Sequence, residues 1–238
     1  MNEMYDDPVL VEAFDQYAQE YNAHYDRPYA LELASVTAGM RVLDAGCGPG
    51  LHAFALQQKG ASVVGIDSSE HMLERARRRL GTDAELVHAS VADELPFRDA
   101  SFDLVMCASV INYMPDATPL LREFARVLTP DGAAVVSTRH PMTDWVRKGG
   151  SYFDVRLESD EFAVDGLGRW HEQFWRQPLS RLCQAVFRAG LLIEQLSEPL
   201  PSEVMARDRP AHYRFLQERP TFVILRLVRS APRGGGQA

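Results

Sequence analysis

The stretch VLDAGCGPG at positions 42–50 decides the fold class of this chain. A short apolar run leads directly into three glycines, Gly46, Gly48 and Gly50, and an amphipathic segment follows. Glycines allow the backbone to adopt positive φ angles and to approach a ligand closely. The pattern is typical of the first strand, turn and helix of an α/β protein that binds its ligand over the turn.

Two acids stand next to this turn and indicate which ligand it holds. A dinucleotide-binding turn reads GxGxxG and places a pyrophosphate on the helix N-terminus, whereas here Asp44 precedes evenly spaced glycines. A carboxylate would repel a pyrophosphate but would suit S-adenosylmethionine, which carries an ammonium and a sulfonium. Asp67 ends the next apolar run, about twenty residues further on, where an acid can accept both hydroxyls of a ribose. The alternative is that Asp67 only caps the next helix.

The chain around the turn alternates short apolar runs with amphipathic stretches, which predicts β-α-β-α units and a parallel sheet. The predicted strands span residues 41–44, 62–67, 84–89, 102–108, 133–138, 191–196 and 221–228. Apolar residues at helical spacing predict helices between them. Residues 36–230 are therefore expected to form one α/β domain.

Three segments lie outside this regular pattern. Residues 1–35 are expected to form an N-terminal helical lid, because their apolar and tyrosine side chains share one helical face. Residues 139–178 form a long insertion after the fifth strand, and insertions of this size are usually functional or flexible. Its many aromatic residues predict packing over a ligand or over the sheet. Residues 231–238 are expected to be a disordered tail.

The composition narrows the class of partner and the compartment. The net charge of −8 and the pI near 5.4 disfavour nucleic acid, since binders of the phosphate backbone are normally basic. The acidic N-terminus lacks the apolar run of a signal peptide, and no stretch is apolar enough to span a membrane. Three cysteines without a CxxC pair indicate free thiols. We expect a cytoplasmic monomer or homodimer that acts on a small molecule.

Five segments, in this order, resemble the class I S-adenosylmethionine-dependent methyltransferases, in particular the small-molecule group that includes the ubiquinone and menaquinone biosynthesis type. The segments are VLDAGCGPG (42–50), VVGIDSSEHMLERAR (63–77), LPFRDASFDLVMCASVINYMPD (95–116), LLREFARVLTPDGAAVVSTRHP (120–141) and FWRQPLSRLCQAVFRAGLLIEQLSEPLP (174–201). The resemblance runs from about residue 17 to residue 228. It implies a Rossmann-like, doubly wound sheet of seven strands, mostly parallel with an antiparallel last strand.

The resemblance also implies an activity and a cofactor site. The activity is transfer of a methyl group from S-adenosyl-L-methionine to an O, N or C nucleophile of a small acceptor, with S-adenosyl-L-homocysteine as the product. The expected cofactor-binding residues are Tyr21, Asp44, Gly46, Gly48, Gly50, Asp67, Ser68, Met72, Ser90, Val91 and Ala108. Ser90 stands where the family often has an acid for the adenine amino group, so either Ser90 with a backbone group or Asp93 reads the adenine.

Methyl transfer asks little of the protein beyond positioning the reactants and excluding water, because the sulfonium methyl is already activated. A base is needed only when the nucleophile arrives protonated. His140, after the fifth strand, is the first candidate and His171 the second; for either one the alternative is a structural or substrate-contacting role. The expected acceptor-side residues are Tyr25, Asn112, Tyr113, His140, Trp170 and Trp175. Asn112 stands where relatives often have histidine.

Other functions are weighed on the same residues. A metal-dependent catechol-type enzyme needs clustered acids near the fourth and fifth strands, and the segment after residue 107 has none, so no metal is expected. An amino-methylating DNA enzyme needs an Asn-Pro-Pro-Tyr or Asp-Pro-Pro-Tyr turn, which is absent from the sequence. Two alternatives stay open: a cofactor-binding module without methyl transfer, and an NAD-dependent oxidoreductase, which Asp44 disfavours.

Overall fold

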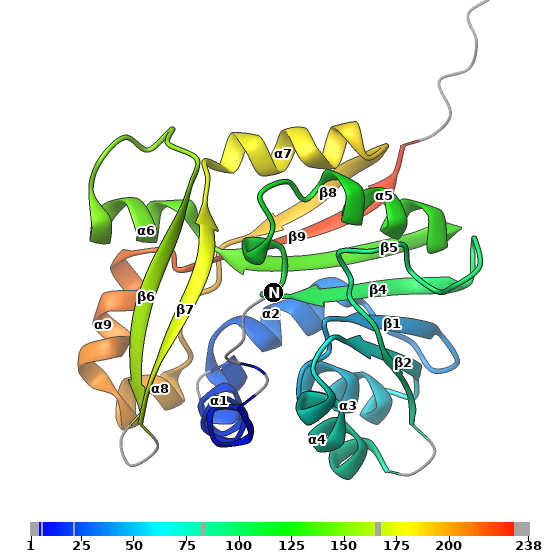
Figure 1. Ribbon diagram of the computed structural model, residues 1–238, viewed down its shortest axis with the longest axis horizontal. Helices are drawn as coiled ribbons and strands as arrows, with labels where there is room; N and C mark the ends of the chain where they lie inside the picture. The colour runs from blue at the N-terminus through cyan, green and yellow to red at the C-terminus, as the bar shows by residue number, and fades with distance from the viewer. Residues whose placement is uncertain (1–4, 6, 21, 82–83, 165–167, 231–238) are drawn as a thin grey trace, which may run out of the picture.

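The computed structural model describes residues 5, 7–20, 22–81, 84–164 and 168–230. A seven-stranded sheet forms its centre, in the order β3-β2-β1-β4-β5-β9-β8 (Figure 1). Strands β1 to β5 are parallel, and β9 lies antiparallel between β5 and β8. The predicted doubly wound α/β sheet with an antiparallel last strand is confirmed. The strands are β1 (Arg41–Ala45), β2 (Ser62–Asp67), β3 (Glu85–His88), β4 (Phe102–Ala108), β5 (Leu128–Arg139), β8 (Leu191–Ser197) and β9 (Phe222–Arg229).

Helices cover both faces of the sheet, because its central strands are apolar on both sides. On one face pack α5 (Thr118–Val127) and α7 (Leu179–Arg188), through buried residues such as Phe124 and Val186. On the other face pack α2 (Asp26–Ala34) and α3 (Leu51–Gln58), through residues such as Ala30 and Leu56. Helix α4 (Glu70–Leu80) lies beside α3 and buries Met72, Leu73 and Ala76. The two apolar cores fix the positions of β1, β2 and β4, and therefore of the carboxyl ends of these strands.

The N-terminal segment lies over the carboxyl ends of these strands. Helix α1 (Pro8–Glu20) is followed by a short 3₁₀ turn (Asn22–His24) and then by α2. Asp15 on α1 is buried and accepts ion pairs from Arg79 and Arg75 of α4, at 2.9 and 3.2 Å. These ion pairs fasten α1 to α4.

The long insertion after β5 contains a helix and a two-stranded arm. Helix α6 (Pro141–Lys148) comes first, and β6 (Arg156–Val164) then pairs antiparallel with β7 (Gly168–Arg176). Figure 1 shows this hairpin standing apart from the main sheet, with α8 (Glu203–Asp208) and α9 (Pro210–Glu218) nearby. Sequence patterning predicts the insertion but not the hairpin.

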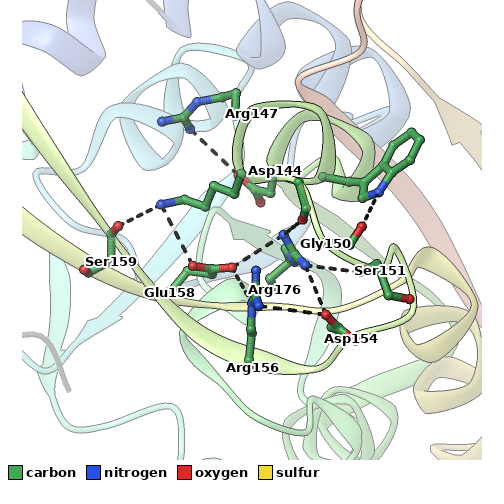
Figure 2. A network of polar contacts seen from close by, with 12 residues as sticks. Asp144, Arg147, Gly150, Ser151, Asp154, Arg156, Glu158, Ser159 and Arg176 are labelled. Carbon is green, nitrogen blue, oxygen red and sulfur yellow. Dashed lines mark hydrogen bonds and ion pairs between the residues drawn. The ribbon is translucent and has the colours of Figure 1, made fainter.

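Buried ionic contacts hold the hairpin in place (Figure 2). Arg176, at the end of β7, is only 2% exposed and donates to the carbonyl oxygens of Gly149 and Ser151 at 2.8 and 3.1 Å. Its guanidinium also pairs with Asp154 and Glu158 at 3.6 and 3.5 Å. A buried guanidinium with this many partners is costly to displace, so the base of the hairpin is a fixed support. None of the helices in the described ranges combines the length and apolarity needed to cross a bilayer.

Candidate active site

A cavity of about 300 Å³ opens at the carboxyl ends of the central strands. Its walls come from the turn after β1, the end of β2, the segment after β4, helix α1 and strand β7. This is the crevice where open α/β sheets bind ligands. One side of the cavity lies near Asp67, where the cofactor is expected. A separate group of polar side chains surrounds Glu172 on the other side.

The glycine turn forms the floor of the first side. Gly46 has a φ of +73°, and a Cβ there would clash with Cγ2 of Val110. Its N–H and that of Cys47 donate to the carbonyl of Ile66 at 2.8 and 3.0 Å, which locks the turn to β2. At Gly48, φ is +51°, and a Cβ there would meet no atom beyond its chain neighbours within 4 Å. The turn is therefore tight underneath and open toward the cavity.

Asp67 lies on the cavity wall and also supports the turn. Its carboxylate accepts the N–H of Gly48 at 2.8 Å and the N–H of Ser69 at 2.9 Å. Burial raises the pKa of this carboxyl group, while the backbone donors oppose the shift. The side chain of Ser69 caps α4 by accepting the N–H of Met72 at 3.3 Å. Asp67 thus lies where a ribose acceptor is expected, and it also contacts Ser69 at the start of α4.

Asp44 takes a different place from the one expected. It is 2% exposed, does not line the cavity, and accepts the N–H of Ala53 at 3.0 Å in the first turn of α3. Burial raises its pKa to about 7. Gly50 and Ser90 also lie off the cavity wall. Asp44 therefore lies beneath the turn rather than at its surface.

Most of the expected cofactor residues do line the cavity. Those that line the cavity are Gly46, Gly48, Asp67, Ser68, Met72, Val91 and Ala108. Tyr21 lies outside the described residues. Two further residues line the same cavity: Arg27, which sequence reasoning expected on the lid over the cofactor, and His52, which it missed.

The second polar group of the cavity joins four side chains from segments far apart in the sequence. Tyr113, in the 3₁₀ turn after β4 (Ile111–Tyr113), donates its hydroxyl to Oε1 of Glu172 on β7 at 2.5 Å. The hydroxyl of Tyr5 lies 2.8 Å from that of Tyr113. Arg139, the last residue of β5, donates to Oε2 of Glu172 at 3.3 Å. All four side chains line the cavity.

Arg139 ties this group to the insertion. Its guanidinium donates to Asp144 on α6 at 2.8 Å and to Asp160 on β6 at 3.0 Å, and it lies 4.0 Å from the ring centroid of Phe174. One cation thus faces three carboxylates, counting Glu172. The sequence marks this arginine only as the residue after a strand; its partners depend on how the hairpin folds back.

Neither histidine expected as a base lines the cavity. His140 is buried, and its Nδ1 accepts the N–H of Met142 at 3.1 Å as the N-cap of α6. Its Nε2 lies 3.0 Å from Oε1 of Glu198, and burial lowers its pKa. The side chain of His171 is 74% exposed. Because successive residues of a strand face opposite sides, His171 points out where Glu172 points in.

The expected acceptor-side residues are also spread apart. Asn112 and Tyr113 line the cavity. Tyr25 is in the core, where the backbone N–H of Thr221 donates to its hydroxyl at 3.2 Å. Trp175 lines a separate, small cavity of about 30 Å³ against α6 and α7. The side chain of Trp170 lies outside the described residues.

Three cavity residues keep buried polar atoms that have no hydrogen-bond partner among the described residues: Nε of Arg27, Nε2 of His52 and Oδ1 of Asn112. Buried polar groups are normally paired. Unpaired ones on a cavity wall are consistent with a ligand that supplies their partners. No cluster of three metal-ligating side chains occurs in the described ranges.

Comparison with known proteins agrees with this geometry. Residues 43–136 match the family model described as a methyltransferase domain. These residues form a class I S-adenosylmethionine-dependent methyltransferase domain. It is 31% identical over 161 residues to a ubiquinone biosynthesis O-methyltransferase of Neisseria meningitidis, covering 64% of each protein. It is 43% identical over 115 residues to a demethylmenaquinone methyltransferase of Clavibacter sepedonicus, covering 47% of this chain and 46% of the relative.

A solved structure extends the likeness of the methyltransferase domain to almost the whole chain. The S-adenosylmethionine-dependent methyltransferase from Mesorhizobium loti superposes with a TM-score of 0.67 at 25% identity, covering 85% of this chain and 96% of that one. The chain spans less than two thirds of the length of the curated relatives named above. The methyl donor of the family is S-adenosylmethionine, and the open turn, the wall carboxylate of Asp67 and the unpaired polar atoms fit such a group.

Proposed function

We propose that this protein transfers a methyl group from S-adenosylmethionine to an O, N or C nucleophile of a small-molecule acceptor. The observation that carries the proposal is that one cavity joins the family's donor-binding turn to a separate polar group around Glu172. A site that brings two reactants together in one place reduces the entropic cost of their reaction. The cavity size falls in the range of small-molecule sites.

On the donor side, Asp67 is proposed to accept the ribose hydroxyls, as its place at the end of β2 favours. Gly46 and Gly48 let the backbone approach the ligand, and Met72, Val91 and Ala108 offer it apolar contacts. Ser68 adds a polar contact from the same wall. When bound, the donor supplies an activated methyl group on a sulfonium.

Three other residues of the expected donor site, Tyr21, Gly50 and Ser90, stay predictions. Asp44 favours the cationic end of the donor only at long range, from beneath the turn.

On the acceptor side, Asn112 and Tyr113 are proposed to contact the acceptor together with Glu172. All three line the cavity. The aromatic rings of Phe14 and Phe222 add apolar surface to the same cavity. The chain's contribution is to hold the nucleophile in line and to exclude water.

Titration calorimetry with S-adenosylhomocysteine and with NAD tests the donor site directly. Binding of S-adenosylhomocysteine with no heat from NAD supports the proposal, and the reverse result would reject it. Transfer of labelled methyl to a small acceptor separates the enzyme from a binding module that retains the cofactor without turnover.

A further inference from the structure

Tyr5, Tyr113 and Glu172 form a continuous hydrogen-bonded chain along the acceptor side of the cavity. The two hydroxyl oxygens lie 2.8 Å apart, and that of Tyr113 lies 2.5 Å from Oε1 of Glu172. All three residues contribute to the cavity wall. None of these contacts is needed to build the sheet or to cover its faces.

Each member of the chain is fixed by its own segment. Tyr113 ends the turn that follows β4, and Glu172 points inward from β7. The backbone carbonyl of Tyr5 accepts the hydroxyl of Ser69, at the start of α4, and its ring meets that of Phe14 edge-on at 5.5 Å. The chain is therefore held from the N-terminal segment, the sheet and the insertion at once.

Bond directions follow from the number of protons. A carboxylate without a proton can only accept, so Tyr113 gives its single hydroxyl proton to Glu172. The oxygen of Tyr113 must then accept the proton of Tyr5. The oxygen of Tyr5 keeps a lone pair for a further donor, and the cavity is where such a donor would lie.

We propose that Tyr5, Tyr113 and Glu172 are a proton relay that takes the proton of a hydroxyl nucleophile on the acceptor. This inference rests on the proposed function. As the acceptor O–H bond breaks, its electron pair forms the bond to the methyl carbon, and the donor's carbon–sulfur pair stays on sulfur. The acceptor proton moves to the oxygen of Tyr5, that of Tyr5 moves to Tyr113, and that of Tyr113 moves to Glu172. The acceptor leaves as a methyl ether with the proton on the carboxyl group.

The surroundings of Glu172 suit a proton acceptor. Arg139 from β5 and Tyr113 lie against the carboxylate, and the charges of Asp160 and Asp144 act from β6 and α6. Burial, the largest effect, raises its pKa above the usual value for glutamate. Arg139 is closer to Asp144 and Asp160, at 2.8 and 3.0 Å, than to Glu172, at 3.3 Å. Glu172 therefore holds the weakest of the three ion pairs.

Glu172→Gln and Tyr113→Phe test the relay, with Glu161→Gln as the matched control. Glu161 lies on the same hairpin, is exposed, and does not line the cavity. Calorimetry with S-adenosylhomocysteine shows first that the donor site is intact in each variant. 4-Nitrophenol is then titrated into each complex, because its visible absorbance distinguishes the ionised from the neutral hydroxyl.

The relay predicts that wild type and Glu161→Gln bind nitrophenol as the anion at a pH where the free compound is largely neutral. Glu172→Gln should bind it in the neutral form, and Tyr113→Phe should lower the ionised fraction. With S-adenosylmethionine, methylation of phenol and catechol should fall about 10²–10⁴-fold in Glu172→Gln and recover as pH rises, the range typical of base catalysis. Methylation of a carboxylate acceptor, which has no proton to lose, should not respond.

Equal ionisation of nitrophenol in wild type and Glu172→Gln would overturn the relay, as would its failure to bind at all. A loss of methylation that is the same at every pH would also overturn it, because that result indicates a structural role. Failure of wild type to bind S-adenosylhomocysteine would instead reject the proposed function itself.

Discussion

The carboxylate of Asp67, at the end of β2, accepts the backbone N–H of Gly48 in the turn after β1 at 2.8 Å. One side chain thus fixes the conformation of the turn and faces the ligand space above it. Removing it should therefore affect both affinity and stability.

Asp67→Ala is expected to weaken binding of S-adenosylhomocysteine by roughly 2–4 kcal/mol, allowing about 1.5–3 kcal/mol for a charge-assisted hydrogen bond. Because two backbone N–H groups lose their acceptor, the melting temperature should also fall. Asp67→Asn keeps an acceptor oxygen and should recover part of the stability. Calorimetry and thermal melts separate the two effects, and unchanged affinity would refute the ribose role.

Gly46→Ala should disturb the same turn by sterics alone. An alanine there meets Cγ2 of Val110 and must also hold a φ of +73°. A strained positive φ costs on the order of 1–3 kcal/mol. The double change Gly46→Ala with Val110→Ala removes the clash but keeps the strained φ, so it should restore only part of the free energy of unfolding. Full recovery would show that the backbone angle is not limiting.

Much of this architecture could be predicted from the sequence because its signals are local. The glycine turn and Asp67 lie within about thirty residues of one another, the span of a βαβ unit. Each strand or helix is likewise predicted from the spacing of apolar residues within its own segment. The apolar runs predict strands that are buried on both faces, and the amphipathic stretches between them predict the helices that cover those faces.

The proposed acceptor side was only partly predictable from the sequence. His171 has the chemistry of a base, but its neighbour Glu172 faces the cavity, and strand parity is set by pairing with β6, which local patterning does not give. Tyr5 precedes any periodic segment and meets Tyr113 only in three dimensions. His140 has the expected place after the fifth strand, yet the helix that starts there takes its Nδ1 as a cap.

His140→Ala is therefore expected to affect stability more than rate. Loss of an N-cap costs about 1 kcal/mol in general. Removal of the buried imidazole also leaves Glu198 without the ring nitrogen that lies 3.0 Å from its carboxylate. Turnover should fall by less than about tenfold, well under the range typical of base catalysis. Denaturant melts and initial rates with one acceptor decide between the roles; a large, pH-dependent loss of rate would return His140 to the position of base.

Arg139→Met should be among the most destabilising single changes outside the apolar core. It takes a shared cation away from Asp144, Asp160 and Glu172, and breaking a buried ion pair costs about 3–5 kcal/mol. Asp160 keeps Lys148 at 2.7 Å and Arg147 at 3.0 Å, so the loss should be felt most at Asp144 and Glu172. Arg139→Lys should lie between, because an ammonium cannot fork between two carboxylates as a guanidinium does. Arg156→Met, which removes an exposed arginine on β6, is the control and should cost no more than about 1 kcal/mol.

Asp26 predicts a pH dependence of folding. Its carboxyl group is buried, without a described hydrogen-bond partner for either oxygen, and burial raises its pKa from 3.8 to about 7. The folded protein then holds a proton that the unfolded chain has lost, so this stability is full below about pH 4 and is lost as pH rises through about 7. The shift corresponds to roughly 4 kcal/mol.

Asp26→Asn should accordingly be more stable than wild type at about pH 8 and should flatten the fall in stability as pH rises from about 4 to about 7. Thermal melts across this range measure the slope. Asp44, whose pKa is raised to about 7 by the same cause, should leave a residual slope of the same sign. A variant that loses stability equally at every pH would contradict this assignment.

The hairpin of β6 and β7 places Glu172, the proposed acceptor-side carboxylate, on a stretch of chain separate from the glycine turn and Asp67. Exchange of residues 141–178 for another insertion would replace Glu172 while leaving the donor turn in its own sequence. Under the proposed function, a change of this one peripheral segment would change the acceptor that the enzyme takes. For protein engineering, the hairpin is the segment to diversify. Every replacement must still supply carboxylates that pair with Arg139.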